Sequence, residues 1–272
     1  MADNPALDLL HQHYERGLEE PRLDEPLGSV ELARTLEVAM RVLPPPPAVV
    51  ADIGGGPGRY ALELAGRGYT VEHRDLVPLH VEQLRAASGS SPGRITTAVG
   101  DARDLDLDDD SVDAALLLGP IYHLVDRDQR VLALREALRV ARPGAPVLVS
   151  AISRWAPRLH GYLAERLYER EAFFTELVRL AEENGRINDS LPGWFTGYCH
   201  RPDQLRDEVE EAGLVVEDLV GLEGLAFALP DLAERLGDPV DREVVLQCAR
   251  AVERVPELLG LSPHLIVVAR AT

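Results

Sequence analysis

The sequence predicts an α/β fold built on a mostly parallel β-sheet. From about residue 48 onward, short apolar runs alternate with amphipathic stretches, a pattern typical of β-α-β units joined by right-handed crossovers. The chain has 272 residues, of which 46% are hydrophobic. That length allows one large domain, or one domain with a cap, and a substantial buried core.

The expected elements follow from local periodicity and stop signals. Helical spacing of Leu7, Leu10, Tyr14 and Leu18, repeated over residues 30–40, predicts helices in the first forty residues. Four prolines at 44–47 end them, because proline cannot continue a helix. Strands are expected at Ala48–Ile53, Thr70–Asp75, Arg94–Val99, Val112–Leu118, Pro146–Ile152, Leu214–Leu219 and Leu265–Arg270. Helices are expected between them at Arg59–Ala65, Leu79–Ala87, Arg127–Val140 and Pro202–Ala212.

The alternation lapses for about fifty residues after Ile152. This segment is predicted to be helical and is rich in aromatic residues, among them Trp194, Phe195 and Tyr198. Small-ligand sites are mostly apolar with few polar anchors, so these three side chains are expected to line a substrate pocket. The alternative is that the aromatic residues form the core of a packed helical cap.

Charge and composition exclude several classes of function. The formal net charge is −18, which disfavours nucleic-acid partners. All 28 basic residues are arginine, so a Walker-A phosphate loop and a Schiff-base lysine are excluded. The two cysteines form no CxxC pair, and the eight histidines form no HxxxH or HExxH pattern. We therefore expect no metal, and no apolar run approaches the roughly 20 residues of a membrane span. A cytoplasmic protein, monomeric or homodimeric, with a small-molecule substrate is expected.

A glycine-rich turn between a strand and a helix carries the strongest chemical signal. The residues are Val49-Val-Ala-Asp-Ile-Gly-Gly-Gly-Pro-Gly58, and glycines at such a turn let the backbone approach a ligand closely. Counted from Gly56, the looser dinucleotide fingerprint ending at Ala61 is also satisfied. Asp52 argues against that cofactor class, because a carboxylate facing the loop repels a pyrophosphate but can order a loop that holds a cation.

The spacing Asp52-x-Gly54-x-Gly56-x-Gly58 resembles motif I of the class I S-adenosylmethionine-dependent methyltransferases. In that family the loop wraps the amino-acid end and the ribose of the cofactor. Further segments look like one bacterial subgroup of the family that acts on small molecules: Gly68-Tyr69, Asp75, Val77-Pro-Leu-His-Val-Glu82, Leu118-Gly-Pro-Ile-Tyr-His-Leu124 and Phe195-Thr-Gly-Tyr-Cys-His-Arg-Pro202. Gly197 and Cys199 depart from the residues usual there.

The resemblance assigns cofactor roles at the ends of the next two strands. Asp75 is expected to accept both ribose hydroxyls, and Leu76 to lie against the adenine. Asp101 is expected to meet the adenine amino group, and the backbone amide of Ala102 a ring nitrogen. These positions fit the rule that open α/β sheets bind ligands beyond the carboxyl ends of their strands.

Candidate catalytic residues follow the fourth strand and the insertion. Leu118 and Gly119 leave the sheet at the crevice, beside the cofactor, and Tyr122 and His123 come next. His123 is expected to position the acceptor. His200 is the better candidate for a general base, which typically contributes about 10²–10⁴-fold.

The resemblance also implies an architecture. The sheet is expected to be doubly wound, Rossmann-like and seven-stranded, with helices on both faces and an antiparallel last strand. Residues 1–43 are expected to form a helical lid, in which Tyr14 covers the cofactor and Arg34 holds the methionine carboxylate. Residues 44–272 are expected to form the methyltransferase domain, with a helical cap inserted after strand 5 at about 153–200.

Three functions remain in competition. An S-adenosylmethionine-dependent methyltransferase acting on a small molecule by in-line displacement explains all of the signals. A nicotinamide-dependent oxidoreductase explains the loop and Asp75, but a Tyr-x-x-x-Lys pair is impossible without lysine. A non-catalytic S-adenosylmethionine-binding protein on the same fold is the third.

Overall fold

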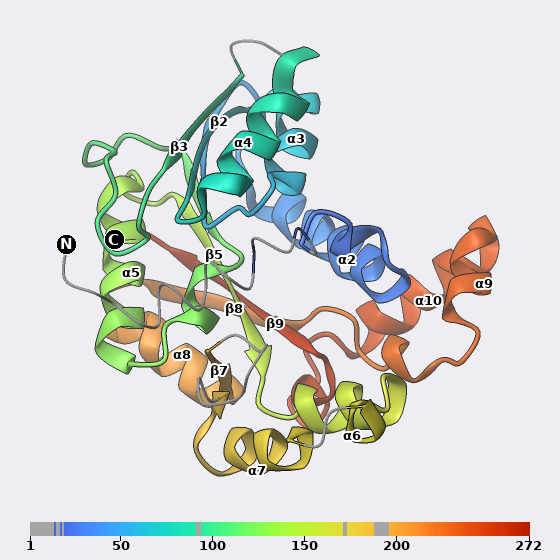
Figure 1. Ribbon diagram of the computed structural model, residues 1–272. Coiled ribbons are helices and arrows are strands. Elements are labelled where there is room, and N and C mark those ends of the chain that lie inside the picture. The colour runs from blue at the N-terminus through green and yellow to red at the C-terminus, as the bar shows by residue number, and fades with distance from the viewer. Residues whose placement is uncertain (1–13, 15–16, 18, 91–93, 171–172, 188–195) are drawn as a thin grey trace.

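The protein is described from a computed structural model (Figure 1). The structure describes residues 14, 17, 19–90, 94–170, 173–187 and 196–272. No helix in these ranges is long and apolar enough to cross a lipid bilayer.

A mixed β-sheet forms the centre of the molecule (Figure 1). The described residues form nine strands, and the main path of the sheet runs β3-β2-β1-β4-β5-β7-β6. Strands β1 to β5 pair in parallel, whereas β9 is antiparallel to both β5 and β8. The strands are β1 (Val49–Ile53), β2 (Thr70–Asp75), β3 (Ile95–Val99), β4 (Ala114–Leu117), β5 (Pro146–Ser153), β6 (Arg186–Ile187), β7 (Gly197–His200), β8 (Val215–Gly221) and β9 (His264–Arg270).

The predicted sheet is confirmed in its parallel part and in its antiparallel last strand. The seven expected strands follow one another as β3-β2-β1-β4-β5-β9-β8. The structure adds two short strands, β6 and β7, from the segment predicted to be helical. β7 extends the sheet because Ile152 and Ser153, at the end of β5, pair with Cys199 and His200.

Helices cover both faces of the sheet (Figure 1). Successive strand residues face opposite sides, so Ala51 and Ile53 pack with α5 and α8 while Val50 packs with α2, α3 and α4. The helices of these layers are α2 (Pro26–Val42), α3 (Arg59–Gly66), α4 (Pro78–Ala87), α5 (Arg127–Val140) and α8 (Pro202–Glu211). Two helices that the sequence analysis did not predict, α9 (Leu232–Gly237) and α10 (Pro239–Val252), lie between β8 and β9.

The insertion after β5 is a small subdomain of mixed structure. It contains η4 (Pro157–Ala164), α6 (Leu167–Arg170), α7 (Phe174–Asn184) and the strands β6 and β7. Its core holds Phe174, Val178 and Cys199. The ring of Phe174 lies so close to Gly161 that a Cβ there would be 2.2 Å from the ring, so this packing needs glycine.

Helix α2 belongs to the body of the protein. Val38 and Ala39 are buried against the sheet, and Val30 packs against Leu246 of α10. A lid was predicted for residues 1–43, but α2 does not fit that role. The lid therefore stays a prediction only for the chain before α2, where Tyr14 lies.

Candidate active site

The glycine-rich turn lies at the point where the strand order reverses, between β1 and β4. Ligands of open α/β sheets bind at such a switch point. Gly54, Gly56 and Gly58 have φ angles of 65°, 57° and 85°, a region that favours glycine. A Cβ on Gly54 would lie 2.7 Å from Cδ of Pro120, so the turn can pass close under the loop that follows β4.

A cavity of about 640 Å³ opens over this turn. It reaches from the carboxyl ends of β1 to β4 to the insertion after β5. Its volume lies within the range of about 300–1,000 Å³ that is usual for small-molecule sites. Predicted site residues that line it are Tyr14, Gly54, Gly56, Asp75, Leu76, Asp101, Ala102, Leu118, Gly119, Tyr122 and His123. Their roles toward a ligand remain predictions.

Asp52 and Gly58 lie behind the wall of the cavity. Asp52 is fully buried beneath the turn, and neither carboxylate oxygen has a hydrogen-bond partner among the described residues. Burial and the nearby charge of Asp75 raise the pKa of Asp52 to about 7, although the backbone N–H of Ala61, which is too poorly placed for a regular hydrogen bond, opposes part of this shift. Gly58 precedes α3, where a Cβ would be 2.4 Å from Leu84. Neither residue lines the cavity, so their predicted part in cofactor binding would act through the shape of the loop.

Asp75 is held in place by three hydrogen bonds. Its Oδ1 accepts from the backbone N–H of Val77 at 2.8 Å and from Nδ1 of His80 at 3.0 Å, and its Oδ2 accepts from the backbone N–H of Gly56 at 2.8 Å. Burial alone would raise the pKa of Asp75, but the bonds from His80, Val77 and Gly56 hold it below the ordinary value. A rigid, ionised carboxylate thus ends β2.

Asp101, after β3, is paired with a neighbouring arginine. Its Oδ1 accepts from Nε of Arg103 at 2.9 Å, and Arg103 also donates to Gln129 at 2.8 Å. Burial opposes ionisation, but the bonds from Arg103 lower the pKa of Asp101. Asp101 lines the cavity as an ionised acceptor, and Arg103 and Gln129 line it too.

Tyr14, Tyr122 and His123 meet on one wall. The hydroxyl of Tyr14 lies 2.7 Å from Nε2 of His123, and the rings of Tyr122 and His123 are 4.7 Å apart. Burial raises the pKa of the Tyr122 hydroxyl, which keeps this hydroxyl neutral. Tyr14 thus connects the segment before α2 with the loop after β4.

His200 does not reach the cavity, and its predicted role as general base is corrected. The residue is fully buried, and its Nε2 lies 3.2 Å from Oε2 of Glu208, which also accepts from Nε of Arg130 at 2.8 Å. Desolvation lowers the pKa of His200, although Glu208 partly offsets it. Arg130 in turn donates to the carbonyls of Leu124 and Val125, so this group supports the loop that carries His123.

The prediction for Tyr198 is also corrected. Tyr198 stacks under the guanidinium of Arg130, with 3.8 Å from Cζ to the ring centre, and is not among the cavity residues. Trp194 and Phe195 lie outside the described residues. The insertion still lines the cavity, but with aliphatic and polar side chains: Leu180, Asn184, Arg186, Ile187 and Thr196. Phe174, another aromatic residue of the insertion, is buried in its core.

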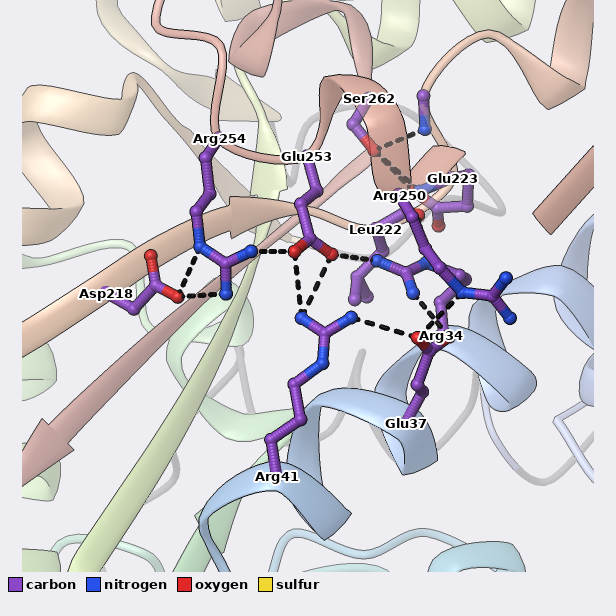
Figure 2. A network of polar contacts seen from close by, with 11 residues as sticks. Arg34, Glu37, Arg41, Asp218, Leu222, Glu223, Arg250, Glu253, Arg254 and Ser262 are labelled. Atoms are coloured by element: carbon purple, nitrogen blue, oxygen red, sulfur yellow. Dashed lines mark hydrogen bonds and ion pairs between the residues drawn. The ribbon is translucent and has the colours of Figure 1, made fainter. Parts of the chain in front are cut away.

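Arg34 lies away from the cavity, which corrects its predicted role as a carboxylate ligand. Its side chain is fully buried and binds Glu253, at the end of α10, while its Nε donates to the carbonyl of Leu222. Figure 2 shows this network, in which Glu253 also accepts from Arg41 at 2.8 Å. These partners hold the guanidinium away from the cavity, whose lining does not include Arg34.

Arg22 is a cavity residue that the sequence analysis missed. It donates to Glu31 at 2.6 Å and to Glu19 at 2.7 Å. Glu31 belongs, with Glu223 and His264, to a group whose ligand atoms lie within 4.8 Å of one another, the spacing of a cation site. Arg22 and His264 already balance the charge of these carboxylates, which favours the predicted absence of a metal. That absence stays a prediction.

The family emerges from comparison with known proteins. Residues 50–144 match the family described as methyltransferase domain. This part of the chain is a methyltransferase domain of the class I S-adenosylmethionine-dependent type. The match spans β1 to the turn before β5, and thus includes the glycine-rich turn, Asp75 and Asp101.

Similar proteins extend this result. An uncharacterised methyltransferase of Mycobacterium tuberculosis is 36% identical over 38% of this chain and 39% of its own length. The ubiquinone/menaquinone biosynthesis C-methyltransferase of Geotalea daltonii is 32% identical over 57% of this chain and 62% of its own. The fold matches 1,6-didemethyltoxoflavin-N1-methyltransferase of Burkholderia thailandensis with a TM-score of 0.60 and 14% identity, over 100% and 92% of the two chains. The chain thus spans less than two thirds of the curated relatives' length.

Proposed function

We propose that this methyltransferase transfers the methyl group of S-adenosylmethionine to a small-molecule acceptor held in the 640 Å³ cavity. The observation that carries the proposal is the continuity of this cavity. It joins the cofactor-type edge of the sheet, with the glycine-rich turn and Asp75, to the side chains of the insertion. A donor and an acceptor can therefore share one enclosure.

The residues at the sheet edge fit a cationic cofactor. The unpaired, buried carboxylate of Asp52 lies under the glycine-rich turn, which favours a positive charge above the turn and disfavours a pyrophosphate. The turn and Asp75 would hold the amino-acid end and the ribose, and Asp101 and Leu76 the adenine. The bound cofactor supplies a sulfonium that is already a reactive methyl donor.

The protein's contribution is then alignment and exclusion of water. His123, fixed by Tyr14 and by the loop that Arg130 supports, would orient the acceptor beside Gly119. With His200 outside the cavity lining, no described residue needs to serve as a dedicated base.

A small-molecule acceptor is supported by charge and by similarity. A net charge of −18 opposes binding to nucleic acid. One relative is named for ubiquinone/menaquinone biosynthesis, and one structural neighbour holds 1,6-didemethyltoxoflavin. The aliphatic and polar side chains of the insertion that line the cavity would contact the acceptor: Leu180, Asn184, Arg186, Ile187 and Thr196.

Two measurements test the proposal. Calorimetry should show micromolar binding of S-adenosylhomocysteine and no binding of nicotinamide dinucleotides; Asp75→Ala should weaken the former by roughly 1.5–3 kcal/mol. Incubation with methyl-labelled cofactor and a small-molecule extract should yield a labelled product identified by mass. Tight dinucleotide binding would instead support an oxidoreductase, and cofactor binding without any labelled product a non-catalytic binding protein.

A further inference from the structure

The hydrogen bonds of Asp75 leave room for only one more donor. An ionised carboxylate offers about four acceptor positions. Val77 and His80 use both positions of Oδ1, and Gly56 uses one of Oδ2. A ribose presents two neighbouring hydroxyl groups, so Asp75 cannot accept both of them while these bonds persist.

His80 supplies an acceptor beside it. It is the third residue of α4, is only 2% exposed and lines the same cavity. Its Nδ1 faces Oδ1 of Asp75, an oxygen that can only accept, so Nδ1 carries the proton. In the neutral imidazole the other nitrogen, Nε2, is then an acceptor. Nε2 is buried and has no hydrogen-bond partner among the described residues.

We propose that Nε2 of His80 accepts one ribose hydroxyl of the cofactor while Oδ2 of Asp75 accepts the other. The inference rests on the proposed function and adds a ligand to it. Asp75 then has two tasks, because it binds one hydroxyl and also fixes the tautomer in which His80 can bind the second.

The surroundings of His80 favour this role. The ring of Tyr14 packs edge-on against the ring of His80, with 4.9 Å between their centres, and shields it from water. A buried acceptor without a partner destabilises the folded protein, and a ligand hydroxyl relieves that cost. The bonds from Gly56 and Val77 hold the carboxylate of Asp75 in place beside His80.

Two substitutions separate the two nitrogens of the imidazole. In His80→Asn the side-chain amide can still donate to Asp75 but offers nothing at the position of Nε2. In His80→Gln the amide oxygen reaches that position. Calorimetry at pH 8 would compare S-adenosylhomocysteine with its 2′-deoxy and 3′-deoxy analogues. Thermal unfolding of each variant would verify that it is folded.

The proposal predicts a specific pattern. Wild type should bind each deoxy analogue about tenfold more weakly than S-adenosylhomocysteine. His80→Asn should bind S-adenosylhomocysteine about tenfold more weakly and show no further loss with one of the two analogues; His80→Gln should recover part of the affinity. If His80→Asn matches wild type with all three ligands, His80 only orients Asp75 and the proposal is overturned.

A measurement on the wild-type protein covers the case in which the variants do not fold. The ¹⁵N chemical shift of His80 Nε2 should change when S-adenosylhomocysteine binds, and should change less with the deoxy analogue that lacks its hydroxyl. An unchanged shift on binding overturns the inference alone. If wild type binds no S-adenosylhomocysteine at all, the proposed function falls with it.

Discussion

At the scale of single residues, Asp52 links stability to cofactor binding. The sequence places it at the end of β1, and the fold buries it without a partner. The consequence is a carboxyl group with a pKa of about 7 in the folded protein, against an ordinary value of 3.8. As pH rises, the unfolded chain therefore loses this proton at a lower pH than the folded protein does. The free energy of unfolding falls as pH rises from about 4 to about 7.

Asp52→Asn should remove this pH dependence. We expect the free energy of unfolding to rise by about 2–4 kcal/mol at pH 8 and by less at pH 5, because asparagine carries no charge to bury. Affinity for S-adenosylmethionine should fall at the same time, since a negative charge beneath the turn is lost. Chemical denaturation at both pH values and calorimetry measure these effects. An equal gain at pH 5 and pH 8 would contradict the argument.

The two candidate catalytic histidines should also separate in experiment. His123 lines the cavity and His200 does not. His123→Asn should therefore slow single-turnover methyl transfer. His200→Asn should leave the rate at saturating acceptor, and its profile between pH 5 and 9, close to wild type. His200→Asn should instead lower the melting temperature, because Glu208 loses a buried partner. A pH profile abolished by His200→Asn would restore the role of general base.

At the scale of elements, α2 is fixed by charge as well as by packing. Glu253 is 4% exposed and binds the fully buried Arg34, and breaking a buried ion pair typically costs about 3–5 kcal/mol. We therefore expect Glu253→Gln to lower the free energy of unfolding by about that amount. Glu176→Gln is the matched control, because the pair of Glu176 with Arg179 is about half exposed and should contribute little. Similar effects of both substitutions would mean that the network in Figure 2 adds nothing beyond surface pairing.

The segment before α2 is the element expected to respond to the cofactor. Tyr14 packs against both His80 and His123, which are proposed to meet the ribose and the acceptor, respectively. Hydrogen exchange in peptides that contain Tyr14 should slow when S-adenosylhomocysteine binds, whereas exchange in α2 stays the same. Unchanged exchange around Tyr14 would mean that it packs permanently, and the lid hypothesis would fail.

At the scale of the whole molecule, His264 in β9 contacts carboxylates from two other parts of the chain. Its Nδ1 lies 2.5 Å from Glu223 and 3.7 Å from Glu31 at the start of α2. Burial opposes its charge, but the two carboxylates raise the pKa of His264 to about 9. A raised histidine pKa contributes stability that is complete below about pH 6.5 and is lost as pH rises to about 9.

Stability should therefore decline between pH 6.5 and 9 by up to about 3 kcal/mol. The decline should be much smaller in His264→Gln, which has no proton to lose; denaturation curves at several pH values in both proteins give the comparison. Parallel curves for the two proteins would show that other groups cause the decline.

Much of the fold and of the cofactor edge can be predicted from the sequence. Thr70–Asp75 and Arg127–Val140 have the predicted bounds, because a strand buried on both faces and an amphipathic helix each carry their pattern locally. The same holds for the turn at Gly54 to Gly58, whose positive φ angles depend on residue type. These segments include Gly54, Gly56 and Asp75, which are among the predicted cofactor residues that line the cavity.

Only the tertiary structure decided which groups the buried polar side chains bind. Arg34 binds Glu253, 219 positions away, and not a ligand, and His200 turns to Glu208 and away from the cavity. The proposed role of His80 as a ribose ligand depends on its contact with Asp75, which the sequence did not show. Periodicity records which face of an element is buried, but a polar side chain on that face bonds to whatever group the rest of the chain brings within about 3 Å. That group lies outside the reach of any local pattern.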